Sequence, residues 1–383
     1  MRIAFFSDTY LPTFDGVVSS VIDFHNELNK RGHDVMIYAP HWGTDDYNIV
    51  GFPLIPINQY DHYGLTIIPQ KYYHILEGKN NNGGGKRTDI IHAHGIGPMG
   101  WRALWASIRL NIPLVLTWHT MIQDAFKIYL PNIGQLSWKL VKLYLALFFK
   151  QCKLIFTPSV DTKYYLMKEF DGLIDGWALG EKIRIVPNGI DLGKYKPIER
   201  TNSKTVLYVG RIAPEKKVET IIGEFLEVRE FTDIRLMIVG TGPDLPRLRE
   251  KYADPGVVDF MGWAEEDVKI MEYQNADVFV TASEFETQGL TLIEAMACGC
   301  PVIGPQSRAI PEAIKDNWNG YLYDPAEPVG LQMAIIKALR NRDRLSNCAL
   351  EMAQAFDMSA CAAKLESCYY DVLGAEIMRR EYD

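Results

Sequence analysis

Two carboxylates, Glu286 and Glu294, stand eight residues apart within residues 282–304, which read A-S-E-F-E-T-Q-G-L-T-L-I-E-A-M-A-C-G-C-P-V-I-G. An apolar run precedes this stretch, and apolar residues spaced three and four apart follow Gly289, so the pattern predicts a strand, a polar loop and a helix. Glu286 then lies in the loop and Glu294 inside the helix. Carboxylates in these places suit sugar and ribose hydroxyls; a solvated helix residue is the alternative for Glu294.

The first turn of this predicted helix suits a phosphate group. The backbone N–H groups of Gly289, Leu290 and Thr291 would stand at a free helix N-terminus, beyond the carboxyl end of a parallel strand. A nucleoside diphosphate sugar offers a diphosphate to these amides and hydroxyls to the two glutamates. We therefore expect a nucleotide-sugar site in this stretch.

Basic residues follow another predicted strand, at residues 205–209. Gly210 and Arg211 come directly after it, and a helix starting near Pro214 would bring Lys216 into the same space. Arg and Lys together can hold a diphosphate leaving group, because hydrogen bonds from charged donors are stronger than neutral ones. The alternative is that Lys216 and Lys217 form an ordinary solvated pair.

The first half of the chain offers Gly16 and His119. Gly16 follows the first predicted strand, at residues 3–6, and precedes a helix, where a glycine can let backbone approach a phosphate; a plain turn glycine is the alternative. No G-x-G-x-x-G accompanies it, so the dinucleotide fingerprint is missing. His119 comes just after a strand at 113–117 and is expected at the crevice beyond it, or else as a hydrogen-bonded loop histidine.

Neither a metal site nor a targeting segment is expected. D-I-I-H-A-H at 89–94 places two histidines on one side of a strand without an evident third ligand, and C-x-C at 298–300 has no second cluster to complete it. The sequence enters a strand directly after Met1, and its six cysteines fit free thiols in a reducing compartment. We therefore expect a cytoplasmic protein.

The charge distribution limits the possible partners. A net charge of -8 argues against general nucleic-acid binding. In a helix predicted over residues 135–153, Lys139, Lys142, Lys150 and Lys153 fall within an arc of about 80°. Such a stripe beside leucines and aromatic residues suits peripheral contact with an anionic membrane surface, whereas a core helix with one solvated face is the alternative. The longest apolar run is far too short to span a membrane.

Five motifs together resemble one family. They are D-G-V at 15–17, H-T at 119–120, V-P-N-G-I-D at 186–191, V-G-R-x-x-P-E-K at 209–216 and E-F-E-T-Q-G-L-T-L-I-E-A-M-A-C-G at 284–299. The chain resembles the retaining glycosyltransferases of family 4. The resemblance implies an α/β protein of the GT-B fold, with two Rossmann-like doubly wound domains facing across a cleft.

The two series of strands and helices in the sequence, separated by a polar segment at 194–204, agree with this fold. The expected domains are an acceptor domain at 1–195 and a donor domain at 196–366, and a tail helix at about 367–383 is expected to cross back to the first domain.

The resemblance also assigns roles to individual residues. It implies that Glu286 contacts the donor sugar, that Glu294 binds the ribose and that His119 lies beside the reacting sugar, with the base near the backbone of Gly262 and Trp263. Glu286 and His119, with the cations Arg211 and Lys216, would be the catalytic residues. Around the diphosphate it implies Gly16, Gly210, Arg211, Lys216, Gly289, Leu290 and Thr291.

The implied reaction retains the anomeric configuration and needs neither a metal nor another cofactor. H-T-M-I-Q-D at 119–124, the lysine-rich helix and T-P-S-V at 157–160 look like the branch that glycosylates diacylglycerol-type lipids, which favours a hexose such as glucose and a membrane lipid as acceptor. A soluble glycan acceptor, with a UDP-sugar or GDP-mannose as donor, is one alternative. A nucleotide-sugar epimerase and a non-catalytic nucleotide-sugar binder are others, from different classes.

Overall fold

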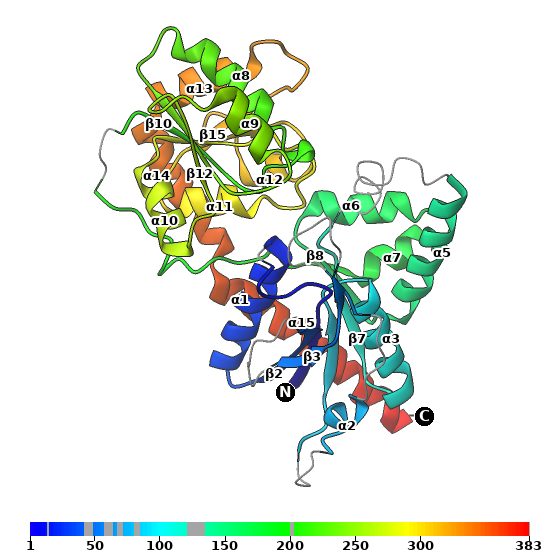
Figure 1. Cartoon of the computed structure of the whole chain (residues 1–383). Coiled ribbons are helices and arrows are strands. Elements are labelled where there is room, and N and C mark those ends of the chain that lie inside the picture. The colour runs from blue at the N-terminus through cyan, green and yellow to red at the C-terminus, as the bar shows by residue number, and fades with distance from the viewer. Residues whose placement is uncertain are drawn as a thin grey trace. The chain divides into compact units, whose positions relative to one another are not determined.

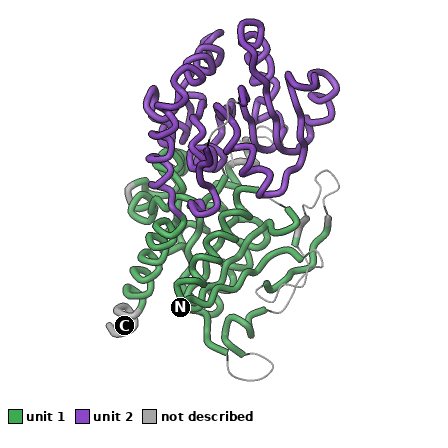
Figure 2. The backbone as a smooth tube through the Cα atoms, turned by 90° about the vertical axis from the view of Figure 1, so that its left-hand side faces the viewer, with its two compact units in different colours: residues 1–189, 358–383 green, residues 190–357 purple. Residues whose placement is uncertain are grey.

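The chain forms two compact units, each built on its own parallel sheet (Figures 1 and 2). The computed structural model describes residues 1–13, 15–41, 49–56, 64–66, 72–79, 85–120, 135–199 and 203–382. Unit 1 comprises Met1–Gly189 and Met358–Asp383, and unit 2 comprises Ile190–Asp357. The two units are described separately below.

Unit 1 contains a seven-stranded sheet in the order β3-β2-β1-β6-β7-β8-β9, with every neighbouring pair parallel. Its strands are β1 (Arg2–Phe6), β2 (Asp34–Pro40), β3 (Ile49–Phe52), β6 (Ile90–Ala93), β7 (Leu114–Thr117), β8 (Leu154–Thr157) and β9 (Ile183–Ile185). Its helices are α1 (Gly16–Lys30), α2 (Tyr73–Leu76), α3 (Pro98–Leu110), α5 (Gln135–Gln151), α6 (Val160–Glu169), α7 (Gly176–Lys182) and α15 (Met358–Tyr382). A short antiparallel pair, β4 (Ile55–Pro56) and β5 (Gly64–Leu65), lies outside the main sheet.

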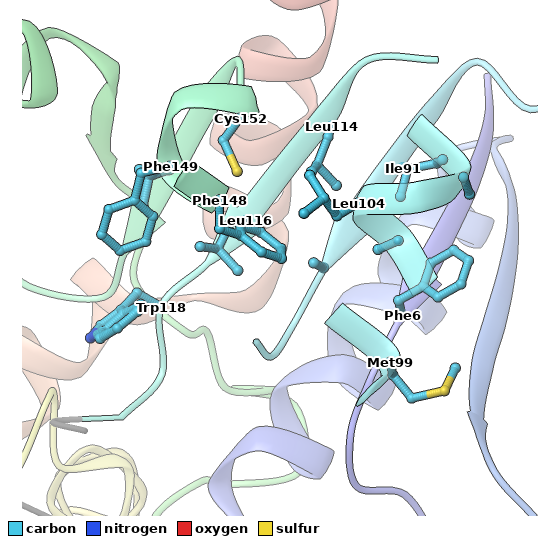
Figure 3. Close-up of a cluster of buried hydrophobic side chains, with 14 of the residues drawn as sticks. Phe6, Ile91, Met99, Leu104, Leu114, Leu116, Trp118, Phe148, Phe149 and Cys152 are labelled. Carbon is cyan, nitrogen blue, oxygen red and sulfur yellow. The ribbon is translucent and has the colours of Figure 1, made fainter. Parts of the chain in front are cut away.

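Both faces of this sheet are buried, because alternate strand residues pack on different helices. Phe6 and Leu116 point to the side covered by α3 and α5, where Phe148 and Phe149 complete the core (Figure 3). Phe5 and Val115 point to the other side, which α1 and α15 cover. Burial on both faces explains why the strands read in the sequence as continuous apolar runs.

The tail helix α15 is an integral part of unit 1. Glu366 on α15 accepts a hydrogen bond from Arg31 Nη1 at 3.1 Å and lies 2.8 Å from His33 Nε2. Tyr369, buried in the same core, has its hydroxyl 2.6 Å from His92 Nδ1. The return to unit 1 therefore occurs at Met358, nine residues earlier than the expected 367.

Unit 2 contains a six-stranded parallel sheet in the order β12-β11-β10-β13-β14-β15. Its strands are β10 (Thr205–Val209), β11 (Arg235–Val239), β12 (Val258–Gly262), β13 (Val278–Val280), β14 (Val302–Pro305) and β15 (Gly320–Tyr323). Its helices are η1 (Pro214–Lys216), α8 (Val218–Arg229), α9 (Leu245–Tyr252), α10 (Glu266–Asn275), α11 (Leu290–Ala297), α12 (Ile310–Ala313), α13 (Gly330–Arg340), α14 (Arg342–Ala353) and η2 (Gln354–Phe356). The unit begins at Ile190 rather than at the expected 196, because Ile190 and Tyr195 pack into its core.

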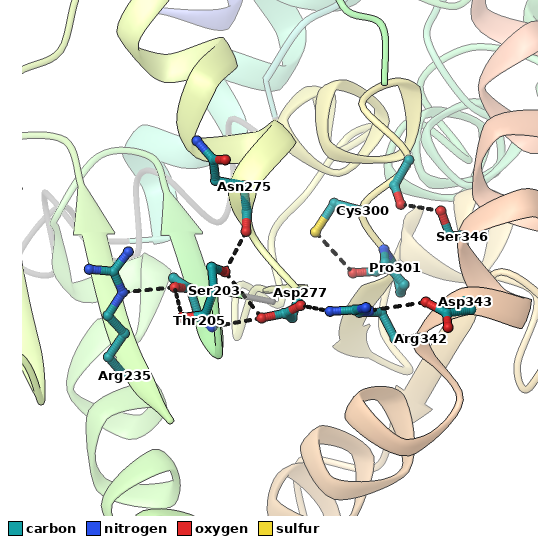
Figure 4. Close-up of polar contacts among 11 residues, drawn as sticks. Ser203, Thr205, Arg235, Asn275, Asp277, Cys300, Pro301, Arg342, Asp343 and Ser346 are labelled. Atoms are coloured by element: carbon teal, nitrogen blue, oxygen red, sulfur yellow. Dashed lines mark hydrogen bonds and ion pairs between the residues drawn. The ribbon is translucent and has the colours of Figure 1, made fainter. Parts of the chain in front are cut away.

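Asp277 connects three segments of unit 2 just before β13 (Figure 4). Its carboxylate accepts a hydrogen bond from the backbone N–H of Thr205 at 2.9 Å and from the hydroxyl of Ser203 at 3.1 Å. It also forms an ion pair with Arg342 at the start of α14. The aspartate is buried, and these partners offset the cost of removing its carboxylate from water.

Replacing Asp277 with Ala is expected to lower the free energy of unfolding by about 3 kcal/mol, because it leaves a partly buried guanidinium and a strand N–H without their acceptor. Urea unfolding followed by circular dichroism measures this loss. Asp233→Ala, which removes the ion pairs of an exposed aspartate with Lys204 and Arg229, is the control and should change the midpoint little. Equal midpoints for the two variants would contradict the structural role of Asp277.

Candidate active site

The predicted site residues of unit 2 gather where the strand order of its sheet reverses. β10 and β13 are neighbours, yet the chain continues from β10 outward to β11 and β12 before it returns to β13. In doubly wound sheets, the loops after two such strands diverge and leave a ligand site at their carboxyl ends. Arg211 and Lys216 follow β10, and Glu286 follows β13, so these three side chains belong to this switch point.

The loops after β10, β11 and β12 are joined through their backbones. The N–H of Ile212 donates to the carbonyl of Thr241 at 2.8 Å, and the N–H of Gly240 donates to the carbonyl of Gly262 at 2.7 Å. A Cβ atom on Gly240 would lie 1.9 Å from the carbonyl oxygen of Gly210, so the approach requires a glycine. Gly210 and Gly262 thus lie on connected loops, and the exposed Trp263 follows directly.

Lys216 and Glu286 form an ion pair across the switch point. Lys216 Nζ donates to Glu286 Oε1 at 2.6 Å, and both side chains are largely buried. Burial favours the neutral acid, but the charge and hydrogen bond of Lys216 outweigh it and hold the pKa of Glu286 below its usual value. Glu286 is therefore an ionised acceptor at neutral pH, suited to hydroxyl groups.

Two further ion pairs surround this contact. Lys217 pairs with Glu284 on the loop after β13, and Arg211 pairs with Glu215 on its own loop. Lys216 and Lys217 are therefore not an ordinary solvated pair, because each contacts a carboxylate from the loop after β13. The side chain of Arg211 is 44% exposed, so its guanidinium is accessible to an anion.

Glu294 lies inside α11 and is buried, so the alternative of a solvated helix residue is wrong. Tyr273 donates its hydroxyl hydrogen to Glu294 Oε2 at 2.7 Å, while Lys269 Nζ and the hydroxyl of Tyr195 donate to Oε1 at 3.0 and 3.3 Å. These three partners of Glu294 were not predicted from the sequence. The spacing of Lys269 and Tyr273, four residues apart on α10, was the available signal that they share a helix face.

The N-terminus of α11 agrees with the predicted strand, loop and helix. Gly289 precedes the helix with φ of 82°, and the helix gives way to Gly299, which has φ of 75°. Gly289 has no side chain with which to cap the helix, so the first turn, with Leu290 and Thr291, carries the partial positive charge of a helix N-terminus. This end of α11 follows the same loop that carries Glu286.

His119 lies in unit 1, two residues beyond β7. Its Nε2 is 3.2 Å from Nδ1 of His94, and the His94 ring in turn lies 4.0 Å from that of His92. His92 contacts the hydroxyls of Tyr369 and Thr117, each at 2.6 Å. Burial lowers the pKa of His119 to about 4, so its imidazole is neutral at physiological pH.

Gly16 is the first residue of α1 in unit 1. Asp15 caps this helix, because its Oδ1 accepts hydrogen bonds from the N–H groups of Val17 and Val18, both at 2.9 Å. Two of the amides at this helix start are therefore already paired with a carboxylate. An additional anion here would have to use the backbone of Gly16 itself.

Asp8 is an acidic residue of unit 1 that was not predicted from the sequence. It accepts hydrogen bonds from the N–H groups of Gly97 and Met99 at the start of α3, both at 2.8 Å. Burial raises its pKa, and these hydrogen bonds offset only part of that effect. An acid two residues after a fully buried strand, within S-D-T at 7–9, was the available signal.

The four lysines of the predicted membrane stripe have different surroundings. Lys142 forms an ion pair with Glu169 at 3.0 Å, and Lys153 forms one with Glu376 at 2.6 Å. Lys139 and Lys150 are exposed. Of the motif at 119–124, residues 121–124 lie outside the described part of the chain, and no described helix is long and apolar enough to cross a bilayer.

Metal binding and the cysteines can be examined for the described residues. Within these ranges, no group of three or more His, Cys, Asp or Glu side chains is arranged to hold a metal ion. Cys298 and Cys300 are buried in the core of unit 2. His92 and His94 instead take part in the chain of contacts that reaches His119.

Known proteins resemble this chain over most of its length. An alpha-monoglucosyldiacylglycerol synthase of Streptococcus pneumoniae is 27% identical over 352 residues, which cover 84% of this chain and 75% of that protein. A GDP-mannose-dependent alpha-mannosyltransferase of Corynebacterium glutamicum is 28% identical over 337 residues, covering 85% of this chain and 77% of that protein.

A solved structure and two family models complete the comparison. The crystal structure of Anabaena HepE in complex with UDP and glucose superposes with a TM-score of 0.70 at 16% identity, covering 97% of this chain and 100% of that one. The predicted fold class, GT-B with two Rossmann-like domains, is confirmed. The model described as Glycosyltransferase Family 4 matches residues 14–194, and that described as Glycosyl transferases group 1 matches residues 203–341. Together these matches show that the chain belongs to the family 4 glycosyltransferases.

Proposed function

We propose that this glycosyltransferase moves a hexose, most simply glucose, from a nucleoside diphosphate sugar to a membrane lipid of diacylglycerol type, with retention of configuration. The observation that carries the donor half is the Lys216–Glu286 pair at the switch point of unit 2, on the loop that leads into α11. The acceptor half is supported by similarity to a diacylglycerol glucosyltransferase. The protein would then act at the cytoplasmic face of a membrane.

The cations of unit 2 suit the departure of the diphosphate. When the bond between sugar and diphosphate breaks, negative charge grows on the leaving phosphate and positive character grows on the sugar ring. Arg211, Lys216 and the N-terminus of α11 would stabilise the negative charge without a metal ion. An incoming diphosphate would compete with Glu286 for Lys216, which would free the carboxylate for the sugar.

Glu286 is proposed to bind hydroxyls of the donor sugar rather than to form a covalent bond. Before the donor binds, its pairing with Lys216 keeps it ionised, and an ionised carboxylate is a strong hydrogen-bond acceptor and a source of negative potential near the ring. The acceptor would attack from the face that the diphosphate leaves, and a phosphate oxygen would take its proton. His119, proposed to lie beside the same sugar, would contribute a neutral imidazole.

Glu294 is proposed to bind the ribose. A carboxylate offers about four acceptor positions, and Tyr273, Lys269 and Tyr195 already donate to it. The ribose hydroxyls would use the remaining position or displace Lys269. The three partners fix the direction of the carboxylate before the donor arrives, which reduces the ordering cost of binding.

A second function is a mannosyl transfer from GDP-mannose to a soluble glycan. The observation that favours it is the similarity to the mannosyltransferase, which is as high as that to the lipid enzyme. Recognition of the base through backbone near Gly262 and Trp263 would leave little trace in side-chain identity. A donor panel therefore separates the two functions.

The first experiment is transfer and hydrolysis with a panel of UDP- and GDP-sugars, with and without vesicles that contain diacylglycerol. We expect turnover of a UDP-hexose that rises with these vesicles. Glu286→Gln should lower kcat by about 100-fold or more, because it removes charge that faces the transition state. Glu284→Gln, on the same loop, is the matched control and should retain most activity. Turnover of GDP-mannose that does not depend on the vesicles would support the second function. No turnover of any donor would indicate a non-catalytic nucleotide-sugar binder.

Replacement of Glu294 with Gln is expected to act on donor binding. A hydrogen bond to a charged group contributes about 1.5–3 kcal/mol, so the KM for the donor should rise about 10- to 100-fold while kcat changes less. Calorimetric titration with the free nucleoside diphosphate should show the same weakening. An unchanged affinity would remove Glu294 from the ribose site.

The pH dependence follows from the lowered pKa of His119, about 4 against a usual 6.5. The unfolded state binds a proton more readily below pH 6.5, so the stability that this neutral histidine contributes is complete above that pH and is lost as pH falls toward 4. Activity should accordingly show no loss due to His119 between pH 6 and pH 8. NMR titration of the His119 ring is the direct measurement, and a midpoint near 6.5 would contradict the prediction.

A further inference from the structure

Six large apolar side chains on two helices of unit 1 face solvent. They are between 45% and 63% exposed. We call them the apolar ridge: Trp101, Trp105 and Ile108 on α3, and Leu140, Leu143 and Leu147 on α5.

The ridge is continuous across the two helices. At 100° per residue, each trio falls within an arc of about 60° on its helix. Trp101 stacks on Tyr144 of α5 with ring centroids 4.9 Å apart and planes 11° apart. The hydroxyl of Tyr144 also donates to the carbonyl of Ile96, just before α3, at 2.6 Å. Tyr144 therefore fills the seam between the two trios.

The opposite faces of α3 and α5 already anchor both helices. Met99 and Leu104 of α3 and Phe148 and Phe149 of α5 belong to the buried cluster against the sheet (Figure 3). The exposed leucines of α5 are thus not the face that packs into the core of unit 1. Their spacing alone fits a buried face and an exposed face equally well. Packing among the described residues of unit 1 leaves this apolar surface exposed.

Charge indicates what covers the ridge. Neither α3 nor α5 contains a single Asp or Glu, in a chain whose net charge is -8. By helical geometry, Lys139 and Lys150 flank the leucines on the side away from Tyr144, and Arg109 flanks the tryptophans on the side away from α5. A second copy of this face would bring cations against cations, whereas an anionic surface matches both flanks.

We propose that the apolar ridge inserts into the interfacial region of an anionic lipid bilayer. Trp101 and Trp105 have the amphipathic rings found at headgroup depth, the leucines and Ile108 enter the acyl boundary, and Arg109, Lys139 and Lys150 contact lipid phosphates. The insertion is carried by leucines between the lysines rather than by the lysine stripe, because Lys142 and Lys153 are already paired with acids. The biological role of this membrane contact rests on the proposed lipid acceptor. The contact itself does not, since vesicle binding can be measured without turnover.

The test is sedimentation with vesicles of phosphatidylcholine, with and without phosphatidylglycerol. Wild type should bind the anionic vesicles, and the triple variant Leu140→Gln, Leu143→Gln, Leu147→Gln should bind at least tenfold more weakly at constant charge. Lys139→Gln with Lys150→Gln should weaken binding in a salt-dependent manner. Phe231→Gln, at a residue 84% exposed in unit 2, is the matched apolar control and should bind as wild type does. Equal binding by the triple variant and wild type would overturn the proposal.

A second readout reports the depth of insertion. Lipids brominated along their acyl chains should quench tryptophan fluorescence of wild type, and Trp105→Phe should remove a measurable part of that quenching. A circular dichroism spectrum and a thermal midpoint of the triple variant that equal those of wild type show that the fold survives the substitutions. Absence of quenching in wild type bound to vesicles would contradict insertion of this face.

Two further outcomes separate this inference from its alternatives. Sedimentation velocity could show that wild type is a dimer and the triple variant a monomer. If the variant also binds vesicles as wild type does, the ridge contacts a second copy of the chain and the proposal is overturned. The wild type could bind vesicles without turning over any nucleotide sugar. If the triple variant then loses vesicle binding, the inference is supported and the proposed function is contradicted. If the triple variant binds vesicles and glycosylates lipid acceptors as wild type does, the proposed function is supported and the inference is overturned.

Discussion

The ion pair between Lys216 and Glu286 joins the two loops that meet where the strand order of unit 2 reverses. Parallel topology alone brings these loops together, but it does not decide their charge state. The lysine keeps the acid ionised despite burial, and the acid holds the lysine against the loop that follows β13. Close approach of Gly240 to the backbone of Gly210 joins the neighbouring loops of the same unit. The proposed donor chemistry thus rests on charges whose positions the sheet determines.

Much of the fold could be predicted because strands covered on both faces are apolar throughout. The strand expected at 205–209 is β10 without any shift, and that expected at 113–117 is β7 within one residue. The position of Glu286 before α11 and of Glu294 inside it also followed from periodicity. Local patterns of this kind depend only on neighbouring residues, which a single sequence contains.

Contacts between distant segments could not be predicted in the same way. Tyr195, Lys269 and Tyr273 reach Glu294 from 99, 25 and 21 residues away, and nothing local marks their convergence. Periodicity also shows that Leu140, Leu143 and Leu147 share a helix face but not whether that face is covered. The domain boundaries differ from the expected ones for a related reason. Ile190 and Met358 belong to the units into whose cores they pack, and a single sequence does not show those contacts.

The placement of α15 has a consequence for the order in which the protein can be made. Unit 1 needs α15 to cover the face that contains Phe5 and Val115, and Tyr369 to contact His92. All of unit 2 is synthesised before this helix exists. On the ribosome, unit 2 can therefore fold as soon as its last strand and helices emerge, while the part of the unit 1 sheet that α15 covers is still open. The earliest segment synthesised is thus among the last to reach its final packing.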